Sequence, residues 1–429
     1  MDRNSHHVDV VKLIRDELKE VPQIPECCIY RVPFRLKSGP FREGKEEVYI
    51  PKVVSIGPLH HGNKGLEKME EKKMIYLKDF LERNDVSLEH CVDTVEESLG
   101  KIRKCYEESL GYKENEHELV KIILVDAVFV IETLLKCRYE NFRDDNDRMF
   151  RPFVLPDVRT EFLLLENQLP FFILKELFKF TKDINISLID FCFSFLSSCY
   201  IFYQWPEEEY MEQIKDTYEP KHLVDLLWKI SAPLVPHEGE SCESVLIPSA
   251  TQLHQAGAKL KKGSAKLKKG SAKNLLDIHF ENGTLTIPKL LIDDGTKIIL
   301  RNLIAFEQCH NSKINYVTVY ITFMDSIIDT PKDVDLLVQE GIIENWLGDS
   351  SEVSSLINRL GEGIHVSIDL YHAQLAKNIN SYCKNPWHSW KANLKQNYFN
   401  TPWVIISFLA ALVLIVLTII QTVYSIIST

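Results

Sequence analysis

The chain has 429 residues, of which 45% are hydrophobic, 26% charged and 10% aromatic, a composition typical of globular proteins. Its net charge of −11 gives no general attraction to nucleic acid, so we expect no DNA or RNA partner. Ten cysteines are scattered singly, apart from Cys27-Cys28, which favours reduced thiols over a disulfide framework.

Apolar residues recur at helical spacing along most of the chain, which predicts a mainly α fold with a multi-helix globular region. We expect an N-terminal helical region over 1–232. The segment 162–180 contains Pro170, which should kink or interrupt its helix because proline lacks the amide hydrogen. The helices predicted here lie around 11–18, 66–81, 122–135, 162–180, 188–203 and 223–230.

A linker is predicted over 233–246, where prolines, a glycine and acidic residues cluster, followed by a C-terminal helical region over 247–395. Near 277–287 an alternating apolar pattern surrounds Asn282-Gly283, which predicts one small antiparallel hairpin with a type I′ turn. This register pairs Phe280 with Leu285 and Ile278 with Ile287. Further helices are predicted over 298–306, 317–328, 334–338, 353–360 and 364–383.

The heptad AKLKKGS occurs twice in succession, over 258–264 and 265–271. Seven residues make nearly two helical turns, so a duplicated heptad on a helix preserves its facing. The favoured interpretation is a solvated helix lengthened by duplication. The alternative is attraction to anionic lipid through Lys261, Lys262, Lys268 and Lys269, at about 1 kcal/mol per lysine.

The C-terminal segment from Trp403 through Leu412 to Ile420 is apolar and uncharged. Eighteen helical residues span about 27 Å, close to the thickness of a bilayer core. We therefore predict a single transmembrane helix over 402–425, with lipid as a partner, in the plasma membrane or an endomembrane. The alternative is a buried core helix.

The N-terminal residues are polar and lack the apolar stretch of a secretory signal, so we expect a C-terminally anchored, single-pass protein. Lys384, Lys391 and Lys395 precede the apolar segment, which favours a cytosolic location for the bulk. Two sequons, at Asn185 and Asn282, would be glycan acceptors if the bulk were external.

Catalytic signatures are weak in this sequence. The segment Gly39–Lys45 matches G-x-x-x-x-G-K, but Glu46 follows where a phosphate-binding loop needs Ser or Thr for Mg²⁺. His60 and His61 are adjacent and lack nearby residues at ligand spacing, so a turn is the better interpretation. There is no G-x-S-x-G, H-E-x-x-H or G-x-G-x-x-G. We therefore expect no enzymatic activity and no cofactor.

A metal site is the alternative, because two E-x-x-H motifs occur, at Glu114 and at Glu307–His310. Paired motifs of this kind, with two further carboxylates, hold di-iron centres in helical bundles. Glu132 and Glu166 lie in apolar segments and would complete the set. Glu114 itself lies in a hydrophilic stretch, which counts against the site.

Three consecutive polar residues, Glu166, Asn167 and Gln168, interrupt an apolar run just before Pro170. Buried polar groups need hydrogen bonds, and proline frees a carbonyl nearby. We predict that the three form a structural polar network rather than a catalytic one.

Several phrases together resemble one plant family, the domain of unknown function 247 family, over about residues 28–425. The phrases are IYRVP (29–33), YIPKVVSIGPLHHG (49–62), LEKMEEKKMIYLKDFLER (66–83), LLLENQLPFF (163–172), DIHFENGTLTIP (277–288) and RNLIAFEQCH (301–310). The second AKLKKGS copy departs from the family pattern. The resemblance implies a mostly helical protein without established enzymatic activity. Some grass members are implicated as self-incompatibility determinants, which implies a recognition role for those members.

The favoured function is therefore a membrane-anchored, non-catalytic interaction or recognition module with a protein partner that the sequence does not identify. The alternatives are a metal-dependent membrane enzyme and a recognition determinant of the self-incompatibility type.

Overall fold

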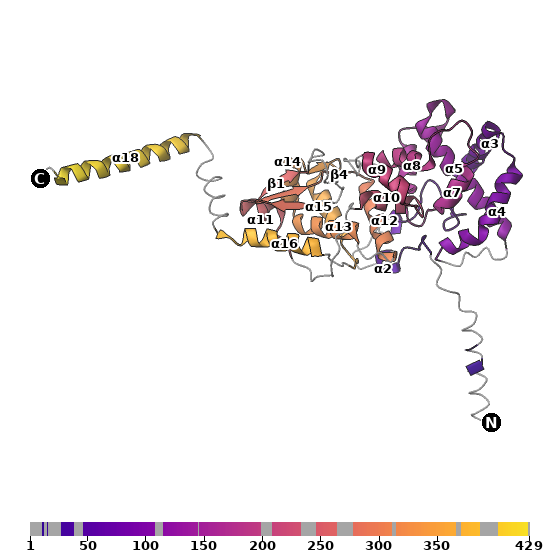
Figure 1. The fold of residues 1–429 in the computed structure, drawn as a ribbon, viewed down its shortest axis with the longest axis horizontal. Helices are drawn as coiled ribbons and strands as arrows, with labels where there is room; N and C mark the ends of the chain where they lie inside the picture. Colours follow the sequence, from indigo (N-terminus) through magenta and orange to yellow (C-terminus); the bar gives the residue numbers. More distant parts are fainter. Residues whose placement is uncertain are drawn as a thin grey trace, which may run out of the picture. The chain divides into compact units, whose positions relative to one another are not determined.

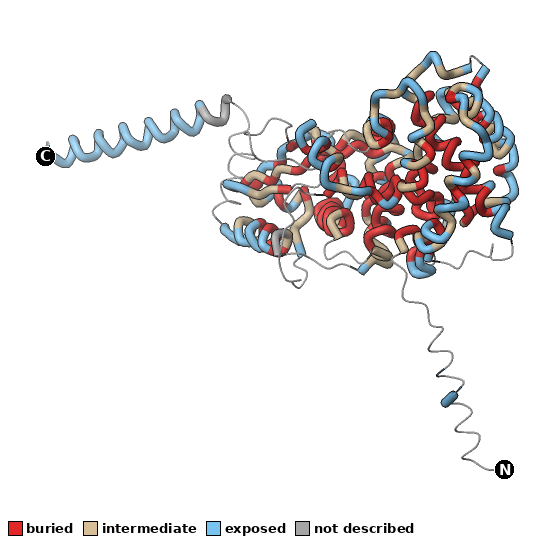
Figure 2. The backbone as a smooth tube through the Cα atoms, turned by 45° about the vertical axis from the view of Figure 1, so that its right-hand side comes forward, coloured by how far each residue is buried: buried red, intermediate tan, exposed pale blue. Residues whose placement is uncertain are grey.

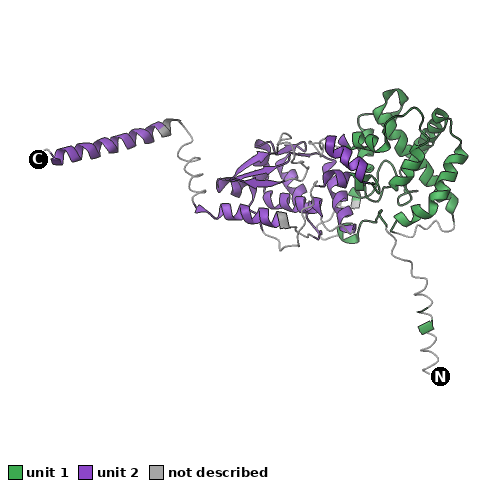
Figure 3. Cartoon of the chain, viewed as in Figure 1, with its two compact units in different colours: residues 1–196, 219–226 green, residues 197–218, 227–429 purple. Residues whose placement is uncertain are grey.

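The computed structural model describes residues 11–12, 15, 27–37, 46–107, 115–144, 146–198, 208–232, 246–263, 278–310, 315–365, 370–386 and 402–427. The chain divides into two compact units (Figure 3). Unit 1 comprises residues 1–196 and 219–226, and unit 2 comprises residues 197–218 and 227–429. The predicted linker over 233–246 lies outside the described residues up to residue 245, so the predicted domain boundaries stay predictions.

Unit 1 is helical, and α5 (Glu116–Arg138) is its central helix (Figure 1). Asn115 caps α5 by accepting a hydrogen bond from the amide of Glu118. Helices α3, α4 and α7 pack against α5, and residues 119–136 of α5 are almost continuously buried (Figure 2). The other elements are α2 (Phe34–Lys37), η1 (Glu46–Val48), α3 (Glu67–Asn84), α4 (Leu88–Cys105), η2 (Glu140–Phe142), η3 (Arg148–Phe150), α6 (Val154–Glu161), α7 (Phe171–Phe178) and α8 (Leu188–Ser197).

The prediction of one helix over 162–180 is wrong for its first half. Helix α6 ends at Glu161, α7 begins at Phe171, and the nine residues between them are non-helical yet all buried. Pro170 is the N-cap of α7, a position where its missing amide hydrogen costs nothing. A buried loop of this kind needs partners for every backbone polar group.

Unit 2 combines helices with two small sheets (Figure 1). Strands β1, β3 and β2 form a three-stranded sheet, and β4 pairs with β5 in parallel. Helix α11 packs against β1, α16 against β2 and α14 against β5. The elements are α9 (Glu208–Thr217), α11 (Ala250–Gln255), β1 (Lys259–Lys262), β2 (His279–Glu281), β3 (Thr284–Ile287), β4 (Leu290–Ile292), α12 (Thr296–Cys309), α13 (Tyr316–Ile327), α14 (Pro331–Gln339), β5 (Ile343–Asn345), α15 (Ser350–Leu360), α16 (Leu370–Cys383) and α18 (Pro402–Ile427). The chain passes between the units within α10 (Leu223–Ser231).

The predicted hairpin is present, with Phe280 opposite Leu285. Asn282 and Gly283 have φ values of 49° and 73°, the left-handed conformation that a type I′ turn requires. Ile278 lies just outside the ladder, which starts at His279, so its predicted pairing with Ile287 is not part of the sheet.

The helix predicted through the lysine repeat is wrong where the structure describes it. Lys261 and Lys262 lie in strand β1, which pairs in parallel with β3 and places Leu260 opposite Leu285. Leu260 is buried while the three lysines of the strand are exposed. Lys268 and Lys269 lie outside the described residues, as does the whole second copy.

The C-terminal segment forms one helix, α18, as predicted. Residues Ile406–Ile427 have a mean hydropathy of 2.6, and this stretch is long and apolar enough to cross a membrane. None of it is buried within the protein (Figure 2). Leu412 and Ile420 are 48% and 52% exposed, and Trp403 lies in the first turn of the helix.

Candidate functional site

A cluster of polar side chains on and beside the buried loop 162–170 binds two N-terminal segments of unit 1. Glu161, the last residue of α6, accepts hydrogen bonds from three consecutive amides, at 2.5 Å from Lys52, 2.8 Å from Val53 and 2.7 Å from Val54. Burial raises the pKa of Glu161, while the three amides favour its ionised form. One carboxylate thus holds the bend of the backbone at Lys52 and Val53.

Asn167 continues this contact by imitating a neighbouring strand. Its Oδ1 accepts from the amide of Ile56 at 2.6 Å, and its Nδ2 donates to the carbonyl of Val54 at 3.0 Å. Gln168 links the loop to the start of α10. Its Nε2 donates to the carbonyl of Leu164 at 2.8 Å, and its Oε1 accepts from the amide of Leu223 at 3.1 Å, at the start of α10.

Glu166 is fully buried and binds the segment from Arg31 to Lys37. Its carboxylate accepts from the Val32 amide at 2.7 Å, lies 3.0 Å from Nη1 of Arg31 and 2.5 Å from Nζ of Lys37, and Nε2 of His60 is 3.1 Å away. Burial alone would raise the pKa of Glu166, but His60 and Lys37 outweigh it and lower the pKa to about 2. The carboxylate therefore stays ionised throughout the physiological range.

A second buried pair lies beside this cluster. Nζ of Lys73 is 2.6 Å from Oδ1 of Asp126 and donates to the carbonyl of Ser55 at 2.6 Å. Oδ2 of Asp126 accepts from the Gly57 amide at 2.8 Å. Gly57 has a φ of 74°, and a Cβ atom there would lie 2.6 Å from the carbonyl oxygen of Gln168, so only glycine fits.

These contacts define what the cluster does chemically. Its carboxylates and amides are bonded to backbone groups and cations, so they position the segments 31–37 and 52–57 against the helices of unit 1. The network role predicted for Glu166, Asn167 and Gln168 agrees with these contacts, and whether it also serves a partner stays a prediction.

The described residues of the predicted metal site each have other partners. Both oxygens of Glu132 are bonded by the guanidinium of Arg83, with Nη1 at 2.8 Å, and Glu166 belongs to the cluster above. The ring of His310 stacks on Phe306, with centroids 5.0 Å apart. Glu114 lies outside the described residues. Within the described part of the chain, no group of three or more His, Cys, Asp or Glu residues is arranged to hold a metal ion.

Glu307, from the E-x-x-H motif in unit 2, is buried, and its carboxylate is hydrogen-bonded. Oε1 accepts from the Trp228 indole at 2.7 Å and from the Val317 amide at 2.8 Å, and Oε2 accepts from the Thr318 amide at 2.8 Å and its hydroxyl at 2.7 Å. The carboxylate thus caps the start of α13. Burial raises the pKa of Glu307 to about 7, against the hydrogen bonds that lower it.

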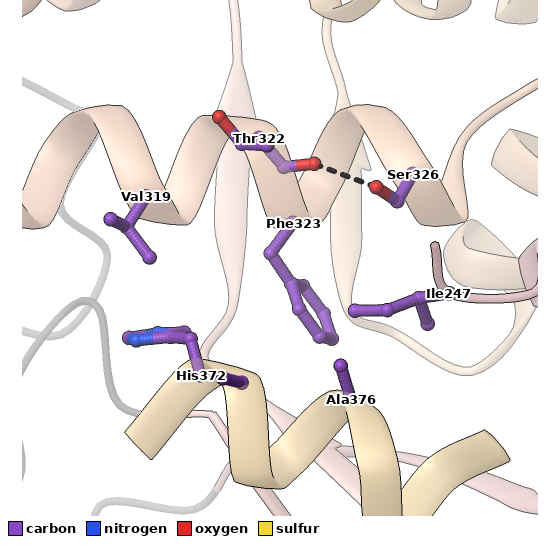
Figure 4. A pocket seen from close by; sticks show the side chains of 8 residues that line it. Ile247, Val319, Thr322, Phe323, Ser326, His372 and Ala376 are labelled. Atoms are coloured by element: carbon purple, nitrogen blue, oxygen red, sulfur yellow. Dashed lines mark hydrogen bonds between the residues drawn. The ribbon is translucent and has the colours of Figure 1, made fainter. Parts of the chain in front are cut away.

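A small cavity lies between α13 and α16 (Figure 4). Phe323, Val319, Ala376 and His372 point into it from the two helices, and its volume is about 30 Å³. This space holds about one water molecule and excludes an organic ligand.

Sequence reasoning missed Glu161, Lys73 and Asp126. Asp126 carried a usable signal, because it is the only charged residue between Lys121 and Glu132 in an otherwise apolar helix. A lone carboxylate in such a helix must be paired when it is buried. Glu161 and Lys73 gave no such signal, because each lies in a charged stretch of sequence.

Comparison with known proteins identifies the family. A family model described as "Plant protein of unknown function" matches residues 29–417. The chain belongs to the domain of unknown function 247 family. Two family relatives come from Arabidopsis thaliana. One UPF0481 protein is 31% identical over 431 residues, covering 94% of this chain and 87% of the relative, and a second is 23% identical over 468 residues, covering 87% and 86%. No solved structure matches the chain.

The first prediction concerns Glu166. Glu166→Gln removes the anion that faces Arg31, Lys37 and His60, so we expect unit 1 to lose about 3–5 kcal/mol of stability. All six tryptophans lie in unit 2, so tryptophan fluorescence reports unit 2, and hydrogen exchange of the buried amides of α5 reports unit 1. The matched control, Glu47→Gln, breaks an exposed ion pair with Lys52 and should change stability by less than about 1 kcal/mol. Equal effects of the two variants would contradict the structural role of Glu166.

The second prediction concerns pH. The folded-state pKa of Glu307 lies above its ordinary value of 4.5, so folded unit 2 binds more protons than the unfolded chain between pH 4.5 and about 7. Glu307 therefore contributes to the free energy of unfolding at low pH. This contribution is lost as pH rises to about 7, and the loss is about 3 kcal/mol at most. Asp325, with a pKa raised by burial to about 6, acts in the same direction.

Urea unfolding of the full chain between pH 5 and pH 8, followed by tryptophan fluorescence, measures this dependence. Glu307→Gln should flatten it, leaving the part due to Asp325. An unchanged slope in the variant would show that Glu307 is ionised in both states across this range.

Proposed function

We propose that this family member is a membrane-anchored, non-catalytic interaction protein, held at a bilayer by α18. The observation that carries the proposal is the 22-residue stretch Ile406–Ile427, with a mean hydropathy of 2.6 and no burial within the protein. In water this helix would expose a continuous apolar surface, which soluble monomers rarely do. In a bilayer the same surface is solvated, and the helix satisfies its own backbone hydrogen bonds.

The interaction role rests on how the polar residues are used. Glu161, Glu166 and Asn167 are buried and bonded to backbone amides within unit 1, and Glu307 is bonded in the same way in unit 2. Such groups fix loops and helix ends, whereas a catalytic group needs room for a substrate beside it. Fixed loops in turn provide a rigid surface for a partner. Proximity labelling of the tagged chain in plant tissue would identify that partner.

Topology is part of the proposal, with both compact units on the cytosolic side. Asn282, in the tight turn of the hairpin at a φ of 49°, is a sequon asparagine and would be a glycan acceptor if the units were external. Protease treatment of intact vesicles should digest the units without prior permeabilisation, and glycosidase should cause no shift in mobility. Protection from protease together with a glycosidase shift would reverse this orientation.

The anchor gives the third prediction. Leu412→Arg places a charge near the centre of α18, which should cost about 3 kcal/mol of insertion free energy. We expect the variant to be released from vesicles by alkaline carbonate, while the unaltered chain stays in the pellet. Tyr424→Arg, near the end of the same helix, is the control, because the cost of a charge falls towards the interface. Release of the unaltered chain by carbonate would end the anchoring proposal.

A further inference from the structure

A pocket of about 410 Å³ lies between α12 and α15 in unit 2, with Leu347 among its lining residues. This volume is within the usual range for small-molecule sites. Three basic side chains line it, Lys297 and Arg301 from α12 and Arg359 from α15. Ser351 and Ser355 supply hydroxyl groups, three leucines form apolar wall, and Glu352 is the one acidic lining residue.

Arg301 is the unusual member of this lining. It is 1% exposed, and its Nη2 donates to the carbonyl of Arg359, but Nε and Nη1 have no hydrogen-bond partner among the residues that the structure describes. A buried polar group without a partner destabilises a fold, and a buried charge without a counter-ion does so more strongly. This residue therefore has a requirement for an anion that the described residues do not supply.

The two buried lysines among the described residues do not share this property. Lys73, which is fully buried, lies 2.6 Å from Asp126, and Lys136 lies 2.7 Å from Asp79. In both cases a carboxylate of the protein compensates the charge of the buried lysine. Beside Arg301 the structure has a pocket instead.

The spacing of the lining residues concentrates the charge. Lys297 and Arg301 are four residues apart on α12, and Ser351, Ser355 and Arg359 follow at intervals of four on α15, so each set shares one helix face. The lining thus carries three cationic side chains and one carboxylate. A phosphate group has the matching charge and accepts hydrogen bonds from guanidinium and hydroxyl groups.

We propose that the pocket between α12 and α15 is a binding site for a phosphate monoester. Lys297 and Arg359 contact the phosphate, Ser355 donates to it, and the covered guanidinium of Arg301 supplies a fixed positive charge behind them. The space beyond the phosphate group accommodates a small polar body such as glycerol. A soluble organophosphate and a phosphomonoester lipid headgroup share this chemistry, and the inference does not depend on the proposed function.

The test uses the full chain in nanodiscs of phosphatidylcholine, with glycerol 3-phosphate as the soluble probe and glycerol as the uncharged control. Thermal unfolding followed by tryptophan fluorescence reports unit 2, which contains Trp346 next to Leu347. We expect glycerol 3-phosphate to raise the melting temperature and glycerol to leave it unchanged. A second arm replaces part of the phosphatidylcholine by phosphatidic acid, and a rise in that arm alone identifies the lipid headgroup as the source. No rise in either arm would overturn the proposal.

Variants separate binding from folding. Arg359→Gln changes an exposed side chain. It should weaken the binding of glycerol 3-phosphate at least tenfold without lowering the melting temperature of the ligand-free protein. Lys332→Gln, an exposed lysine on α14 outside the pocket lining, removes the same charge and should leave binding unchanged. Equal weakening by both variants would show general charge attraction and contradict a specific site.

Arg301→Met tests the buried charge, because methionine fills similar space without a charge. We expect the ligand-free melting temperature to be unchanged or higher, and the rise caused by the probe to be lost. A lower melting temperature with the probe response intact would assign Arg301 to the structure of α15 alone and overturn its part in the site.

Discussion

The fold of unit 1 depends on side chains that bind backbone amides of two N-terminal segments. Glu161 and Asn167 bind the backbone from Lys52 to Ile56 by hydrogen bonds of 2.5–3.0 Å, and Glu166 binds Val32 and the cations on either side of it. Buried backbone amides need hydrogen-bond partners, and water does not reach them in the interior. Residues on and beside one loop therefore supply the partners that allow Val32 and the segment from Val54 to Gly57 to lie buried.

The two units use buried carboxylates in different electrostatic settings. Glu166 faces Arg31, Lys37 and His60, and its pKa falls to about 2 in spite of burial. Glu307 faces neutral donors only, so burial dominates and its pKa rises to about 7. Arg301 is the opposite case, a buried cation whose Nε and Nη1 have no partner within the described residues. Compensated and uncompensated charges thus occur in one chain, and the uncompensated one lines the largest cavity described above.

Much of the architecture follows from local sequence pattern, and the exceptions have physical causes. Continuous apolar runs predicted α5 and α18, and the Asn282-Gly283 pair predicted the hairpin, because each is specified by neighbouring residues. The segment 162–170 has a helical pattern, but hydrogen bonds to residues more than a hundred positions away hold it as a loop. Lys261 lies in a strand because β3 supplies a partner, which no local pattern reveals. The candidate pocket likewise joins α12 to α15 across about fifty residues of sequence, and only the fold brings them together.

The long separations within the cluster of unit 1 also set the order of events during synthesis. Val32 and Glu166 are 134 residues apart, which is about 7–27 s of elongation at about 5–20 residues per second. Until Glu166 is made, Arg31, Lys37 and His60 lack the carboxylate that they face in the folded unit, and until Asn167 is made the amide of Ile56 lacks its acceptor. Ile29 and Gly57 bond to residues made earlier, so the contacts of one N-terminal segment are completed by residues that leave the ribosome at very different times.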